Sequence, residues 1–205
     1  MSSARLCSLG LLATALCLAQ PQQDKDIYAI YSLLLTNAQT SHGPDANQRL
    51  LIVDTTVPGL PERPCLALNS LGQPRVAEIF KDFEERKDRP QKLKRELAVT
   101  KPYELLTESE AEQFRNSRAA PDSSARFSGV TDLFSFSNVY FDKAGTLAVV
   151  QLTSWCGTLC ALFQWTMLEK QSDGSWKQAP GVSCSSIATR TKSESSRHQQ
   201  PIRFL

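Results

Sequence analysis

The sequence predicts an α+β fold, in which N-terminal helices and one strand pack on a C-terminal antiparallel β-meander of about four strands. In the first half of the chain, apolar residues recur at helical spacing on either side of a single run rich in β-branched residues. In the last third, short apolar runs alternate with tight polar turns, as in successive antiparallel strands. No regular alternation of strands and helices is present, so a doubly wound parallel sheet is not expected.

Residues 1–19 have the composition of a cleavable secretory signal peptide. Arg5 is their only charge, and the apolar run that follows it is shorter than the roughly 20 residues of a membrane-spanning helix. The small residues Cys17 and Ala19 favour cleavage before Gln20. A lipid anchor on Cys17 is not expected, because a large Leu precedes it where a lipidation motif has a small residue. We therefore expect export to the periplasm or the cell exterior, with no membrane span.

The exported part is expected to be one α+β domain over residues 20–188, followed by a mobile polar tail over residues 189–205. The formal net charge of +2 falls to +1 with the leader, because Arg5 is the only charged residue removed. A chain so close to neutral lacks the clustered cations that nucleic acids require, and the basic residues of 81–95 are interleaved with acids. The expected partner is therefore an unknown protein or a small ligand, and not a nucleic acid.

The first helix is expected over residues 27–35, with Asp24 or Asp26 as its cap. One face of this helix is apolar and consists of Ile27, Ile30, Tyr31 and Leu34. The run 49–57 is rich in β-branched residues and stops at Pro58, which predicts a strand.

The second helix is expected to begin at Pro74, because proline suits the first turn of a helix. Its apolar residues recur at helical spacing and are Val76, Ile79, Phe80 and Phe83. Pro90 interrupts this charged helix, and a short extended piece is expected at 97–99. The sequence 107–110 has the form of a capping box and predicts a third, short helix that runs through Phe114.

The β-meander is expected from four runs joined by short connections. Polar turns follow the first and third runs, and a cysteine-bounded loop follows the second. The four expected strands are Phe134–Phe141, Thr146–Thr153, Ala161–Glu169 and Ser175–Gln178.

Six cysteines are present, and Cys7 and Cys17 lie in the leader. An even number of cysteines in an exported chain indicates disulfides, and sequence alone leaves all three pairings of the other four open. These four disulfide candidates are Cys65, Cys156, Cys160 and Cys184.

The most specific local motif is Cys156-Gly157-Thr158-Leu159-Cys160. Its two cysteines either close a ring at the end of a hairpin or pair separately with the other two. A redox-active dithiol would need a thiol of lowered pKa, and redox motifs have two intervening residues where this one has three. A zinc site with four cysteine ligands is a further alternative, although an oxidising compartment favours disulfides. We expect no metal and no cofactor.

No catalytic motif is recognisable, and no catalytic residue is predicted. His42 and His198 are the only histidines, and both lie in polar segments where solvated side chains are expected. Asp54 is better explained as a solvated strand end, and Glu108 and Glu110 as acids at a helix N-terminus. The aromatic residues of the meander are expected in the core, or in part around a ligand groove. The candidate ligand or partner surface is Trp155, Gly157, Thr158, Leu159 and Trp165.

The region 105–176 resembles a set of uncharacterised exported bacterial proteins. The resemblance lies in a Ser-x-Val-x-Phe-Asp strand over 137–142, the Cys-Gly-x-Leu-Cys loop, and a Leu-x-Lys strand that ends near Gly-x-Trp at 174–176. Asn138 and Tyr140 stand where Arg and Gly are expected from the resemblance, and Ala161 stands where a glycine is expected. The resemblance implies export, and it implies no reaction.

These observations favour a non-enzymatic exported module of the cell envelope that binds a partner or ligand through its sheet and the Cys156–Cys160 loop. One alternative is an enzyme, either a thiol–disulfide protein that uses Cys156 and Cys160 or a hydrolase with an unrecognised site. A structural protein of the envelope is the other alternative.

Overall fold

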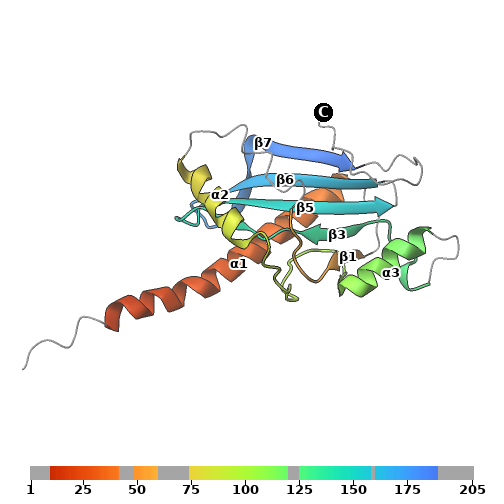
Figure 1. Cartoon of the computed structure of the whole chain (residues 1–205), viewed down its shortest axis with the longest axis horizontal. Coiled ribbons are helices and arrows are strands. Elements are labelled where there is room, and N and C mark those ends of the chain that lie inside the picture. Colours follow the sequence, from red (N-terminus) through yellow and green to blue (C-terminus); the bar gives the residue numbers. More distant parts are fainter. Residues whose placement is uncertain (1–9, 42–48, 60–73, 120–124, 158–159, 189–205) are drawn as a thin grey trace, which may run out of the picture.

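The computed structural model of the chain describes residues 10–41, 49–59, 74–119, 125–157 and 160–188. A seven-stranded mixed sheet forms its centre, with helices on both faces (Figure 1). The elements are helices α1 (Gly10–Ser41), α2 (Pro74–Arg86) and α3 (Glu108–Ala119), and strands β1 (Leu50–Val53), β2 (Tyr103–Leu106), β3 (Leu133–Phe136), β4 (Tyr140–Phe141), β5 (Leu147–Gly157), β6 (Cys160–Lys170) and β7 (Trp176–Ala188). The predicted α+β class is confirmed.

The sheet has the strand order β2-β1-β3-β5-β6-β7, and β4 also pairs with β5. The path from β3 to β7 is the expected antiparallel meander. By contrast, β1 pairs in parallel with both β2 and β3, which the sequence did not predict. Parallel pairing joins strands that are distant in the chain, so no turn sequence between them predicts it.

Strands β3 and β4 were expected as one continuous strand. They lie along the same edge of β5, but the pairing shifts by one residue between Phe136↔Leu152 and Tyr140↔Val149. The hydroxyl of Ser137 accepts a hydrogen bond from the Gln151 N–H at 2.8 Å, which satisfies the backbone at this irregularity. The interruption is therefore a bulge stabilised by a side chain.

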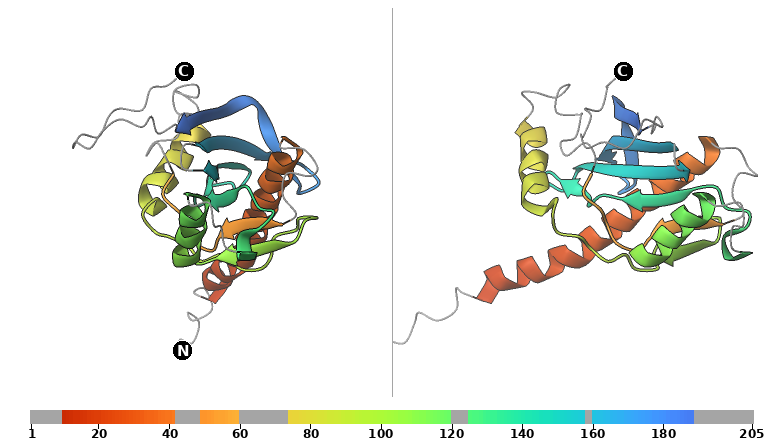
Figure 2. Two further views of the ribbon diagram at one scale, coloured as in Figure 1. Left: turned by 90° about the vertical axis from the view of Figure 1, so that its right-hand side faces the viewer. Right: turned by 45° about the vertical axis from the view of Figure 1, so that its right-hand side comes forward.

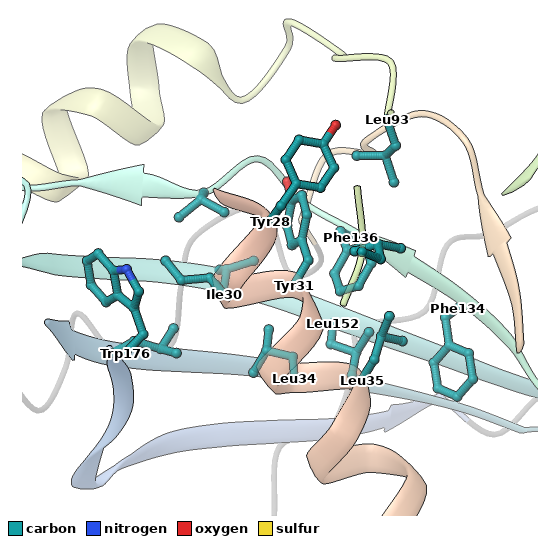
Figure 3. Packing of buried hydrophobic residues seen from close by; sticks show 14 of the residues in the cluster. Tyr28, Ile30, Tyr31, Leu34, Leu35, Leu93, Phe134, Phe136, Leu152 and Trp176 are labelled. Atoms are coloured by element: carbon teal, nitrogen blue, oxygen red, sulfur yellow. The ribbon is translucent and has the colours of Figure 1, made fainter. Parts of the chain in front are cut away.

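Helix α1 covers one face of the sheet with the residues that the sequence placed on its apolar side (Figure 3). Tyr31 stacks on Phe136 with ring centroids 4.2 Å apart, and its hydroxyl donates to the Ser137 carbonyl. Ile30 and Leu35 are fully buried in the same cluster. The first helix thus docks through the predicted face.

Helix α1 begins earlier than predicted, because it is continuous from Gly10. Asp24 and Asp26 therefore lie within the helix and do not cap it. Each forms an ion pair with a lysine, Lys94 and Lys170 respectively. No helix in the described part of the chain is long and apolar enough to cross a membrane.

Helices α2 and α3 cover the opposite face of the sheet at its two ends (Figure 2). Val76, Ile79 and Phe83 of α2 are buried as predicted, and the helix starts at Pro74. The capping box of α3 is confirmed, because the Glu110 carboxylate accepts from the Thr107 N–H and the Thr107 hydroxyl accepts from the Glu110 N–H.

Two strands differ from expectation. The extended piece expected at 97–99 is irregular, and the strand lies just after it, at β2. Strand β7 continues to Ala188, well past the expected end at Gln178, with a shift in its pairing with β6 between Thr166 and Leu168. A shift of register interrupts the alternation of apolar and polar residues, so the alternation alone does not predict the full length of such a strand.

Candidate functional site

The β5–β6 hairpin ends in the Cys-Gly-x-Leu-Cys motif, and the two cysteines are joined to each other. The disulfide links Cys156 and Cys160, whose Cα atoms lie 5.1 Å apart. Gly157 has a φ of +149°, a conformation that a side chain would disfavour. Of the pairings left open by the sequence, the hairpin staple is therefore the one formed. Thr158 and Leu159 lie outside the described residues.

The two halves of this hairpin differ in burial. The half remote from the disulfide consists of residues 147–152 of β5 and 165–168 of β6. It packs between α1 and α2 and is buried on both faces. Toward the disulfide the strands extend past this cover, and several apolar side chains become half-exposed. These are Trp155, Ala161, Leu162 and Phe163. Alternation along β6 places Leu162 on one face of the sheet and Phe163 on the other.

The two tryptophans of the candidate surface have different environments. Trp155 is half-buried and packs edge-on against Phe114 of α3, with centroids 5.7 Å apart. Trp165 is 1% exposed and contacts Phe83 of α2 at 6.0 Å between centroids. The inclusion of Trp165 in an exposed surface was therefore wrong. The pleat places Trp165 in the middle of the sheet, where α2 covers it.

Of the two remaining disulfide candidates, the structure describes Cys184 and not Cys65. Cys184 is half-buried against the cluster that α2 forms with the sheet, and it is disulfide-bonded. Cys65 lies outside the described residues. Because Cys156 and Cys160 pair with each other, neither of them is the partner of Cys184.

Two adjoining hollows, of 330 Å³ and 290 Å³, lie on either side of the turn between β4 and β5. They share a rim made of Gln23, Phe141, Asp142 and Lys143. The first extends to Asp26 and Lys170, and the second extends along α2. Both are therefore lined by side chains of either charge.

Asp26 is a buried acid beside the first hollow. Its carboxylate accepts from the Lys170 ammonium at 2.7 Å and from the indole N–H of Trp176 at 3.1 Å. Both carboxylate oxygens are thus engaged by β6 and β7. This arrangement fastens α1 to β6 and β7.

Asp142 is equally occupied. One oxygen accepts from the N–H groups of Thr146 and Leu147, and the other accepts from the Arg75 guanidinium at 2.7 Å. Burial acts to raise the pKa of this carboxyl, but the backbone and Arg75 hydrogen bonds outweigh it and lower the pKa below its usual value. Asp142 therefore stabilises its turn and anchors the start of α2.

Asn138 and Tyr140, which depart from the resembled pattern, are both buried between α2 and the sheet. The Asn138 amide donates to the carbonyls of Arg86 and Arg89 at 2.9 and 3.0 Å, just where α2 ends. Burial raises the pKa of the Tyr140 hydroxyl to about 12. Here the two residues hold α2 in place, and they form no accessible site.

The other residues weighed for catalysis have structural partners. Asp54 pairs with Lys92 at 2.7 Å, beside the end of β1. Glu110 pairs with Arg126 and caps α3, which lowers its pKa to about 2. His42 and His198 lie outside the described residues. In the described ranges, no group of acidic, histidine or cysteine side chains is arranged to hold a metal ion.

The contacts of Asp26 with Lys170 and Trp176 were not foreseen. The partners are separated from it by 144 and 150 positions, and no local pattern connects them. The half-exposed Leu162 and Phe163 were likewise missed, because an apolar strand residue is expected in the core.

Comparisons of the chain with protein-family models, curated proteins and solved structures gave no match.

Proposed function

We propose that this chain is an exported, disulfide-stapled module that binds a partner protein through the disulfide end of the β5–β6 hairpin. The observation that carries the proposal is the set of half-exposed apolar side chains at that end, with Leu162 and Phe163 on opposite faces. Apolar side chains that stay partly accessible at the end of a sheet offer contact area to a partner protein. The Cys156–Cys160 disulfide holds the end in one shape, which lowers the entropy lost on binding.

Export is supported by the relation of α1 to the rest of the molecule. The N-terminal part of α1 projects away from the sheet, and the packed part begins further along (Figure 2). Pro21 lies in the interior of the continuous helix, where proline costs about 3 kcal/mol. Cleavage before Gln20 would place Pro21 in the first turn, where its missing N–H has no cost. Cleavage would therefore remove a projecting segment and the energetic cost of a proline inside the helix.

The thiol–disulfide alternative is less favoured by the position of the motif. Cys156 and Cys160 lie on paired strands, whereas redox-active cysteines gain their low pKa from a helix N-terminus or a nearby cation. The two hollows are less favoured as a ligand site, because both carboxylate oxygens of Asp26 and of Asp142 already accept hydrogen bonds from within the protein.

The binding proposal is tested by site-specific photo-crosslinking in intact exporting cells. A photoreactive phenylalanine analogue replaces Phe163, and in a matched variant it replaces Lys177, which is exposed on β7. We expect a discrete protein adduct from position 163 and none from position 177. Excess purified domain should suppress the adduct, and the Leu162→Ser domain should suppress it less. The same adducts from both positions, or none from either, would refute a site at the hairpin end.

A further inference from the structure

Strand β7 forms one edge of the sheet, and its two halves differ in the features that protect an edge. Among the described strands, β7 pairs with β6 alone (Figure 1). Its first half contains Lys177 and Pro180, and the shift in its pairing with β6 lies between Gln178 and Ser183. Charges, prolines and bulges are the features by which natural edge strands avoid pairing with another chain. The first half of β7 is therefore protected.

The second half, residues 183–188, has none of these features. Its six residues are uncharged and include no proline, and their pairing with residues 161–166 of β6 is regular. No described strand pairs with the outer side of this half. An unprotected edge of this kind can accept an extended segment of another chain as an additional strand.

The unprotected half of β7 lies beside the apolar side chains of the hairpin end. Leu162 pairs with Ile187, and Phe163 pairs with Ser186. Leu162 and Phe163 are half-exposed and lie on opposite faces of the sheet. An element that packs on one face can contact only one of them. A strand added at the edge directs alternate side chains to both faces, so it can contact both.

The composition of β7 determines which kind of segment fits. Neighbouring strands lie about 4.8 Å apart, so an added strand lies about twice that distance from β6. Large side chains can meet across β7, because residues 183–186 between them are Ser, Cys, Ser and Ser. No residue from 178 to 189 is charged, so a charged segment would lose its hydration without gaining a counterion. The segment that fits is therefore uncharged, with large apolar side chains on both faces.

We propose that the partner protein binds by strand addition. An extended, uncharged segment of the partner pairs with residues 183–188 of β7 and places apolar side chains against Leu162 on one face and Phe163 on the other. This proposal rests on the proposed function and states how the partner of the hairpin end is bound. Main-chain hydrogen bonds to β7 supply affinity, and the two apolar contacts select the segment.

The test uses the full chain in intact exporting cells, with a photoreactive phenylalanine analogue at position 162 or, separately, at position 163. We expect both positions to give an adduct with the same protein. Mass mapping should place the two attachment points within about four residues of each other, because side chains of one strand alternate between the faces. Attachment points in separate segments, an adduct from only one position, or an adduct between two copies of this chain would overturn the proposal.

A second comparison changes the edge itself. Ser185→Lys adds a charge to the unprotected half of β7, and the matched control Gln178→Lys adds the same charge to the protected half. Both side chains are exposed. We expect Ser185→Lys to lower the yield of the position-163 adduct by about tenfold, because a lysine on an edge strand opposes pairing. Gln178→Lys should leave the yield unchanged. If Ser185→Lys does not fold, the attachment points from positions 162 and 163 still decide.

The outcomes separate this proposal from the proposed function. An adduct from position 163 whose yield is the same in folded Ser185→Lys and in Gln178→Lys would overturn strand addition and leave the site at the hairpin end intact. The absence of any adduct from position 163 would refute the proposed function itself.

Discussion

The carboxylate of Asp26 joins α1 to β6 and β7, because it binds both Lys170 and Trp176. Replacement by asparagine should leave the Lys170 ammonium without its counterion, with only 19% of that side chain exposed. We expect Asp26→Asn to lower the free energy of unfolding by about 2–3 kcal/mol, as measured by urea denaturation.

The matched control for this ion pair is Asp24→Asn. Asp24 lies on the same helix as Asp26 and pairs with Lys94, but the side chains of Asp24 and Lys94 are 54% and 58% exposed. An exposed pair is screened by water, so this variant should lower the unfolding free energy much less than Asp26→Asn does. Equal losses from the two variants would contradict the anchoring role of Asp26.

Gly59 is buried directly against the indole of Trp165. A methyl group at this position would overlap the outer ring of the indole, so Gly59→Ala should destabilise the fold by about 1–3 kcal/mol. Trp165→Phe removes that ring and should relieve the overlap. In a double-mutant cycle by thermal denaturation, Gly59→Ala should therefore lower the stability less in the Trp165→Phe background than in the wild type. Additive costs would show that the two residues do not touch.

The lowered pKa of Asp142 predicts a specific dependence of stability on pH. The folded-state pKa lies below the unfolded value, so the carboxylate stabilises the fold above about pH 4 and loses this effect as pH falls through the folded pKa. The difference in unfolding free energy between the wild type and Asp142→Asn should therefore narrow below about pH 4. Urea titrations at several pH values measure it, and a constant difference would contradict the account.

At the scale of elements, the sequence pattern predicted the features that depend on residues close together in the chain. The apolar face of α1, the start of α2 at Pro74 and the capping box of α3 follow from residues within a turn or two of each other. The parallel pairing of β1 with β2 and β3 could not be predicted in this way, because it joins segments about fifty and eighty residues apart. The bulge at Ser137 was missed because the run around it has a uniform strand composition.

The staple at the end of the β5–β6 hairpin makes a prediction for that element. The closed loop is short, so loop entropy predicts that Cys156→Ser lowers the unfolding free energy by about 2 kcal/mol under oxidising conditions. Because one bond is lost in either case, the double variant with Cys160→Ser should lose no more than the single variant. An unchanged denaturation midpoint in both variants would show that the bond does not stabilise the hairpin.

At the scale of the whole molecule, the candidate site was predicted in part. The motif itself marked the hairpin end, and the structure joins its two cysteines. The sequence could not tell which aromatic residues reach the surface, because that depends on where α2 and α3 end over the sheet. Trp155 lies beside α3 and stays half-exposed, whereas Trp165 lies under α2 and is buried.

The proposed export would also determine the chemistry of the cysteines across the molecule. If the leader is removed, four of the six cysteines remain, and Cys156 pairs with Cys160. Cys184 is disulfide-bonded as well. An exported domain of this kind should contain two disulfides and no free thiol.

The most direct test is the intact mass of the protein secreted by a bacterial host from the full chain, after exposure to a thiol-alkylating reagent. We predict the mass of residues 20–205 with no alkyl group added, and four alkyl groups once the protein is reduced first. A chain that retains residues 1–19, or one alkylated without prior reduction, would contradict the account of an exported, disulfide-stapled domain.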